Sequence, residues 1–165
     1  MYIKLQSKNA NQIASFLQNH DVYDEEEFIF AYDIDIQNTT ELDLRNSLFN
    51  YQMLGYASLN QQGNIKETFL LQVIKNQRCN SLARIELLSV SNMEFAKECF
   101  KEIIEDLKLI NVKKIILNLM RRQLNERNRI ILRELGFRSE VVYAAKDNDT
   151  LRDCITYTLT IKGEL

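Results

Sequence analysis

The stretch of residues 112–137 constrains the fold most, because it predicts a strand, a helix and the start of a second strand in succession. Residues 112–119 are aliphatic and partly β-branched, which is typical of a buried strand. Gly136 is placed to end the following helix in the left-handed conformation, and Phe137 begins the next strand pattern. The apolar residues of that helix, which we expect on its inner side, are Ile130, Ile131, Leu132 and Leu135.

Changes of periodicity predict further elements on both sides of this stretch. Gly63 is expected to take a positive φ in a turn between two strands. The order of elements predicts one α/β domain, residues 1–165, with a mixed central sheet and helices on both faces. Strands are expected at residues 2–6, 52–59, 66–74, 82–90, 139–145 and 154–161, and helices at 8–19 after a cap at Ser7, at 41–50 and at 93–109.

Two segments of the first half combine polar and apolar residues. Residues 21–36 mix an acidic cluster with aromatic and aliphatic side chains, so we expect a helical start and partial burial. The helix at 41–50 is expected to turn four apolar side chains inward, namely Leu42, Leu44, Leu48 and Phe49. Both segments should therefore contribute to the core.

Asn125, the helix after it and Leu135-Gly136-Phe137 follow a strand at a distinctive spacing. With these residues the second half, 81–161, resembles the GNAT superfamily of N-acetyltransferases, whose members have this pattern after their fifth strand. The resemblance implies a single-domain acetyltransferase-like fold and transfer of an acetyl group from acetyl-CoA. It also implies that acetyl-CoA lies in a splay between the fourth and fifth strands, here residues 82–90 and 112–119.

The resemblance implies a set of cofactor-binding residues around that splay. They are Leu88 and Val90 on the fourth strand, Asn92 after it, and Asn125, Arg127 and Arg129 near the last helix. In the family a loop of the pattern Arg/Gln-x-x-Gly-x-Gly/Ala binds the pyrophosphate, and this chain departs from it. Residues 91–94 contain no glycine, and Ser91-x-x-Glu94 predicts a capping box that uses the N–H groups a pyrophosphate needs. Glu94 also places a negative charge in the first turn, which speaks against tight binding of CoA.

Catalysis in the family uses a base on a central strand and a tyrosine that protonates the leaving thiolate. Glu86 is the carboxylate that we expect within such a strand, and a salt bridge with Arg84 is its structural alternative. The position of the family's tyrosine is occupied by Leu132, so Tyr143, or else Tyr157, is the candidate acid. Tyrosines in a sheet also serve as packing residues, and that interpretation stays open.

Charge is distributed unevenly along the chain although its net charge is only −2. Residues 9–44 contain nine carboxylates and no Lys or Arg, whereas residues 108–138 are strongly basic. The acidic part would attract a cationic amine or a basic protein, and its candidate substrate-binding residues are Asp24, Glu25, Glu26 and Glu27. The alternative is that both parts are solvated surfaces.

Several classes of protein are disfavoured by composition. No apolar run reaches the roughly 20 residues that cross a bilayer, and the start does not resemble a signal peptide, so we expect a cytoplasmic protein without membrane partners. Three dispersed cysteines and one histidine predict neither a disulfide framework nor a metal site. The basic helix lacks interleaved aromatics, so no nucleic acid is expected. A homodimer remains open.

Two functional hypotheses follow from these observations. The first is an N-acyltransferase that uses acetyl-CoA, with a divergent phosphate loop, on a cationic amine. The second is a catalytically inactive domain of the same fold that serves as a binding or assembly module. The departures at residues 91–94 and at Leu132 favour the second. The usual activity of the resembled superfamily favours the first, which is the function we predict.

Overall fold

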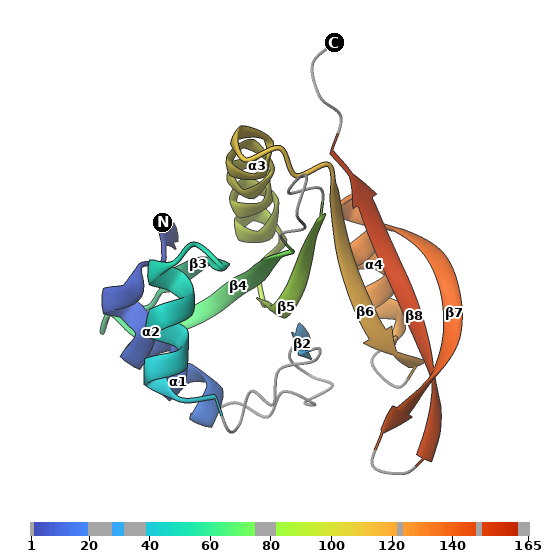
Figure 1. Cartoon of the computed structure of the whole chain (residues 1–165), viewed down its shortest axis with the longest axis horizontal. Helices are drawn as coiled ribbons and strands as arrows, with labels where there is room; N and C mark the ends of the chain where they lie inside the picture. Colours follow the sequence, from blue (N-terminus) through green and yellow to red (C-terminus); the bar gives the residue numbers. More distant parts are fainter. Residues whose placement is uncertain are drawn as a thin grey trace.

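The computed structural model describes residues 2–19, 28–31, 39–74, 82–121, 124–147 and 150–161. Within these ranges the strands form one eight-stranded mixed sheet, in the order β1-β3-β4-β5-β6-β8-β7, with β2 paired to β5 outside this path (Figure 1). The strands are β1 (Tyr2–Lys4), β2 (Phe28–Ala31), β3 (Met53–Leu59), β4 (Ile65–Ile74), β5 (Leu82–Val90), β6 (Lys114–Met120), β7 (Arg138–Asp147) and β8 (Thr150–Thr160). The helices are α1 (Ala10–Asn19), after a 3-10 turn η1 (Ser7–Asn9), α2 (Glu41–Phe49), α3 (Met93–Leu109) and α4 (Glu126–Glu134).

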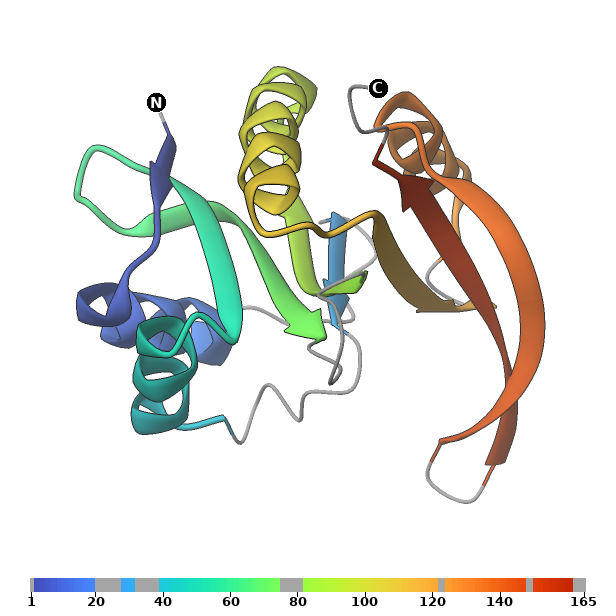
Figure 2. The same cartoon turned by 45° about the horizontal axis from the view of Figure 1, so that its top comes forward.

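The sheet divides where β5 and β6 separate. These two strands pair in parallel only through Leu82–Arg84 and Lys114–Ile116. Beyond that point they diverge, and β2 lies in the gap between them in both views (Figures 1 and 2). There β2 pairs antiparallel with the last four residues of β5, from Leu87 to Val90. The half of the sheet that contains β4 and the half that contains β8 therefore form the two sides of a splay.

Two apolar clusters cover the two faces of the sheet. On one face α3 and α4 pack on side chains of β4, β5 and β6, including Phe69, Ile85 and Leu117. On the other face α1 and α2 pack on Leu70 and Leu87. The alternation of neighbouring residues between the clusters follows from the two-residue period of a strand. The predicted mixed sheet with helices on both faces is confirmed.

Most predicted elements are found, and several details differ. Residues 82–90 and 93–109 form β5 and α3 as predicted, and Gly63 and Gly136 have positive φ angles of 80° and 89°. The predicted cap at Ser7 is wrong, because Ser7 begins the 3-10 turn and Gln6 precedes it as the cap. Leu42 and Phe49 are exposed and only Leu44 and Leu48 of α2 are buried, so two of the four inward predictions are wrong. Strand β2 was not predicted, while the expected helical start at 21–27 lies outside the described residues.

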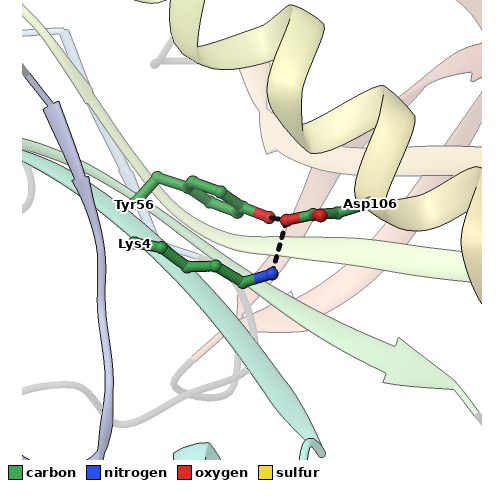
Figure 3. A network of polar contacts seen from close by, with 3 residues as sticks. All are labelled: Lys4, Tyr56 and Asp106. Carbon is green, nitrogen blue, oxygen red and sulfur yellow. Dashed lines mark hydrogen bonds and ion pairs between the residues drawn. The ribbon is translucent and has the colours of Figure 1, made fainter.

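A polar network links the edge of the sheet to α3 (Figure 3). Lys4 Nζ lies 2.6 Å from Asp106 Oδ2, and the hydroxyl of Tyr56 donates to the same oxygen. Burial opposes ionisation of Asp106, but the hydrogen bonds from Lys4 and Tyr56 outweigh it, so the pKa of Asp106 lies below its usual value. Tyr56 is buried, and burial together with Asp106 raises the pKa of its hydroxyl. The network therefore joins β1, β3 and α3 through one carboxylate.

We expect Asp106→Ala to lower the free energy of unfolding at neutral pH by about 1–3 kcal/mol, because the buried Tyr56 hydroxyl loses its acceptor. Tyr56→Phe should cost less, since it removes the donor as well. Because the pKa of Asp106 is lowered by folding, its contribution is present above the unfolded pKa of about 3.9. That contribution is lost as the pH falls through the lower folded pKa, so the variant and wild type should converge there.

Urea unfolding at neutral pH and at a series of falling pH values measures this difference. Glu105→Ala is the control, because it breaks a pair with Lys108 at the exposed end of the same helix, worth under about 1 kcal/mol. Equal losses from the two variants at neutral pH would show that the network adds no more than a surface ion pair.

Candidate functional site

The splay opens at Glu86. The last pair between β5 and β6 is Arg84 with Ile116, and the first pair between β5 and β2 is Leu87 with Ala31. Between them Glu86 is the extra residue of a β-bulge, because Ile85 and Leu87 face consecutive residues of β4. A bulge bends its strand and re-aims the bulged side chain. The place where the sheet divides is thus marked by a buried carboxylate.

Glu86 is held by a neighbouring arginine. Arg84 Nε donates to Glu86 Oε1 at 2.6 Å, and another guanidinium nitrogen of Arg84 donates to Gln72 Oε1 at 2.8 Å. The salt bridge that the sequence offered as an alternative is therefore present. It fixes the position of the carboxylate at the opening, as a general base also requires. The catalytic role of Glu86 stays a prediction.

A cavity of about 490 Å³ lies at the mouth of the splay, between α3 and α4. It brings together two predicted cofactor-binding residues, Val90 from the end of β5 and Arg127 from α4. Ile130, which we expected to be buried, is exposed and lines this cavity instead. The remaining lining residues are Ser91, Met93, Glu126 and Ile131. A cation beside apolar side chains suits a ligand that has both an anionic and an apolar part.

The other predicted cofactor-binding residues lie around this cavity without lining it. Asn92 and Asn125 are the N-caps of α3 and α4, and their side chains accept from the N–H groups of Glu94 and Asn128, each at 2.8 Å. Leu88 is buried on the face that packs against α3. Arg129 is exposed on α4. The two cap residues therefore position the helix ends, both of which begin at the cavity.

The turn between β5 and α3 is occupied by Glu67 of β4. One carboxylate oxygen, Oε1, accepts from Ser91 N at 2.6 Å, from Asn92 N at 2.6 Å and from Ser91 Oγ at 2.9 Å. The other oxygen accepts from Ser58 Oγ at 3.0 Å, and Glu67 is only 2% exposed. The predicted Ser91-Glu94 capping box is wrong, because Asn92 is the cap and Ser91 donates to Glu67.

Acetyl-CoA, which the resemblance implies, fits this region only in part. The turn does not fit a pyrophosphate, because the Glu67 carboxylate already accepts its N–H groups. The edge of β5 from Leu87 to Val90 pairs with β2, so it is not available to a pantetheine arm unless β2 moves. The cavity beside α4 does fit, since Arg127 offers a positive charge to phosphate and its apolar neighbours suit the arm.

A second cavity, of about 660 Å³, lies beside α1. Val90 and Ser91 line both cavities, so the two meet at the end of β5. Amide and hydroxyl side chains of α1 and of the β3–β4 turn dominate the lining, with Lys66 as the ionisable residue among them. Two cavities that meet at one strand end can hold two ligands side by side.

The structure does not bring Tyr143 to the opening. Tyr143 lies on β7, and β8 separates β7 from β6, so it is two strand spacings, about 10 Å, from β6. Tyr157 is closer, on β8 opposite Leu117 of β6, and packs against the core. The candidate acceptor-binding residues Asp24, Glu25, Glu26 and Glu27 lie outside the described residues.

Two features of the site escaped the sequence analysis. Glu67 lies at the start of a predicted strand, where a charged side chain is ordinarily solvent-exposed, and its partners Ser91 and Asn92 are 24 and 25 residues away. Strand β2 sits in a segment dominated by acidic residues. The only signal was the aromatic and aliphatic run that begins at Phe28.

Other chemistries receive no support from the described part of the chain. Burial raises the pKa of the Cys99 thiol to about 12, so it is protonated at neutral pH and a poor nucleophile. Among the described residues, no group of three or more His, Cys, Asp or Glu is arranged to hold a metal ion. None of the described helices combines the length and apolar character needed to cross a membrane.

Comparison with known proteins was made at three levels. No protein-family model matches the sequence, and no curated protein matches it. Solved structures match closely in shape. A probable acetyltransferase from Staphylococcus epidermidis has a TM-score of 0.74 at 12% identity, with 98% of this chain and 99% of that chain covered. An acetyltransferase of the GNAT family from Streptococcus pneumoniae has a TM-score of 0.74 at 15% identity and the same coverage.

A third similar structure is the spermidine/spermine N-acetyltransferase from Vibrio cholerae, with a TM-score of 0.62 and 14% identity over 97% of this chain and 93% of that chain. Identities this low show a shared fold, and the coverage shows that it extends over nearly the whole length of both chains. With its splayed β5 and β6 and its helices on both faces, the chain therefore has the fold of the GNAT acetyltransferases.

Proposed function

We propose that the chain is an N-acyltransferase that moves an acetyl group from acetyl-CoA to a cationic amine. The observation that supports this most is the opening at Glu86, where β5 leaves β6 and two cavities meet at the end of β5. The two cavities can hold a donor and an acceptor side by side at Val90 and Ser91, and the buried carboxylate of Glu86 lies four residues earlier on the same strand. The use of acetyl-CoA would place the protein in the cytoplasm.

The roles of the residues follow from their positions. Arg127 and the apolar residues of the α3–α4 cavity would hold acetyl-CoA. The turn at Ser91 would not, because Glu67 already accepts the N–H groups of Ser91 and Asn92. Acetyl-CoA supplies an acyl thioester when it is bound. Glu86 would accept the proton that an ammonium group must lose before its nitrogen can attack, while Arg84 keeps the carboxylate in place. Tyr143 remains a hypothesis for the acid.

A cationic acceptor is supported by charge and by one similar structure. The nine carboxylates of residues 9–44, without a Lys or Arg among them, raise the local concentration of a cation. The similar protein from Vibrio cholerae is named for spermidine and spermine, which are polyamines. We therefore propose a polyamine-like amine or a basic protein as the acceptor.

A second function is favoured by two contacts within the splay. Strand β2 pairs with the free edge of β5, and Glu67 occupies the turn before α3. Both contacts fill positions that a donor uses in the resembled family. A catalytically inactive binding or assembly module would keep such contacts permanently, and its acidic segment would bind a basic protein partner.

Thermal denaturation with acetyl-CoA separates the two functions. A donor at 100 times its dissociation constant should add about 2.7 kcal/mol to the stability of an acyltransferase and nothing to that of an inactive module. Arg127→Gln should weaken binding about tenfold, since charge-assisted hydrogen bonds contribute roughly 1.5–3 kcal/mol. Arg133→Gln is the matched control, because Arg133 is exposed on the same helix and does not line the cavity. Equal effects of the two substitutions on binding would show that the cavity is not the site that binds acetyl-CoA.

Glu86→Gln should lower the rate of acetyl transfer to spermidine by roughly 100- to 10,000-fold, because it removes the proposed base. It should also remove the acidic limb of the pH–rate profile. Thiol release from acetyl-CoA measures both. Arg84→Gln is the control, since it breaks the same ion pair but keeps the carboxylate. Arg84→Gln should keep the acidic limb of the pH–rate profile, and a Glu86→Gln enzyme that keeps both its rate and that limb would show that Glu86 is not the base.

Replacing Asp24, Glu25, Glu26 and Glu27 by their amides should raise the KM for spermidine at low ionic strength and leave kcat unchanged. The reason is that attraction between solvated charges is screened over about 8 Å at physiological salt. Steady-state kinetics at low and at physiological salt test this expectation. The variant Glu105→Gln alters one exposed carboxylate of α3, outside residues 9–44, and serves as the control. A KM that is insensitive both to the substitutions and to salt would show that the segment is only a solvated surface.

A further inference from the structure

Three donors converge on one oxygen at the start of α3. They are the N–H groups of Ser91 and Asn92, each 2.6 Å from Glu67 Oε1, and the hydroxyl of Ser91 at 2.9 Å. Backbone N–H groups at a helix N-terminus that point to one place form the common binding arrangement for phosphate and other anions. Here the anion is a side chain of the protein itself.

Glu67 is fixed in this position from two directions. It belongs to β4, where it pairs with Ser58 of β3 in the sheet, and Ser58 Oγ also donates to Glu67 Oε2. The side chain is 2% exposed, so water does not compete for these hydrogen bonds. A buried carboxylate that accepts four hydrogen bonds is part of the folded structure of the turn. Its displacement by a ligand would break these hydrogen bonds and is costly in free energy.

We infer that Glu67 is a specificity-determining residue that excludes phosphate groups from the turn between β5 and α3. Its carboxylate takes the donors that a phosphate would use, and its charge repels one. The inference rests on the proposed function only in naming the donor. An acyl donor for this chain would then be bound by its acyl arm and through Arg127, and its pyrophosphate would contribute nothing at Ser91 and Asn92.

The same geometry explains why Glu94 is not the decisive charge. Glu94 lies in the first turn of α3, is exposed, and gives only its backbone N–H to Asn92. Its side chain therefore leaves the donors of Ser91 and Asn92 untouched. Glu67 acts on them directly, so the two carboxylates make a matched pair for a test.

The test uses inorganic pyrophosphate as the probe and the backbone amide NMR signals of Ser91 and Asn92 as the readout. Every chain compared, including the one called wild type for its unchanged Glu67, also carries Arg127→Gln, because Ser91 lines the cavity in which Arg127 could hold the probe. In the wild type these two signals should not move when pyrophosphate is added. In Glu67→Ala, which leaves both N–H groups without the carboxylate, they should move and saturate, with an affinity at least tenfold above that of the wild type. Glu94→Gln should resemble the wild type.

Glu67→Gln keeps the size of the side chain and an oxygen that can still accept, so it provides a folded variant if Glu67→Ala does not fold. It should bind pyrophosphate more tightly than the wild type and less tightly than Glu67→Ala. Saturable shifts of Ser91 and Asn92 in the wild type would overturn the inference. So would a folded Glu67→Ala or Glu67→Gln that gains no affinity.

These outcomes are independent of the proposed acyltransferase activity, because no acyl donor or acceptor is present. A chain that gains pyrophosphate binding in Glu67→Ala but never transfers an acetyl group would support the inference and contradict the proposed function. An active acetyltransferase whose wild-type turn binds pyrophosphate would support the proposed function and contradict the inference.

Discussion

The bulge at Glu86 is the feature on which the rest of the site depends. It ends the parallel pairing of β5 with β6 after three residue pairs and turns the remainder of β5 away. From that separation follow the splay and the place of β2 within it (Figure 1). The cavity between α3 and α4 lies beside the same strand, at Val90. Without the bulge, β5 would continue to pair with β6. The two strands would then leave no gap, and no ligand or strand could enter between them.

A splayed sheet leaves backbone groups without partners, and this chain satisfies them from within. Buried N–H and C=O groups are costly unless they are hydrogen-bonded. The free edge of β5 receives β2, and the N–H groups that open α3 receive the Glu67 carboxylate. The two contacts differ in how firmly they are held. Glu67 is buried in the sheet, whereas β2 is a strand of only four residues. A ligand could displace β2 and take over its hydrogen bonds to β5, but it could not displace Glu67 in this way.

How much of this could be predicted depends on the range of the interactions. Helix α3, strand β5 and the glycine cap at Gly136 were correct because spacing, apolar alternation and turn chemistry are local properties. The capping box at Ser91 was wrong because its competitor, Glu67, is far away in sequence. Leu42 and Phe49 were expected to be buried because helical spacing does not show how much of a helix surface its neighbours cover. In the structure only Leu44 and Leu48 of α2 are covered. Strand β2 depends on an edge that exists only after β5 has been bent.

The two proposed functions require different behaviour of the same strand. An acyltransferase that also binds its donor along β5, as the resembled family does, needs that edge at least once in each turnover, so the pairing of Leu87–Val90 with β2 would have to be weak enough to exchange. A binding module gains from the opposite, a strand that permanently covers the edge and prevents pairing with other chains. The four residue pairs between β2 and β5 are a small cooperative unit. Their rate of amide exchange, compared with that of the β3–β4 pairing beside them, is therefore the property in which the two functions differ most.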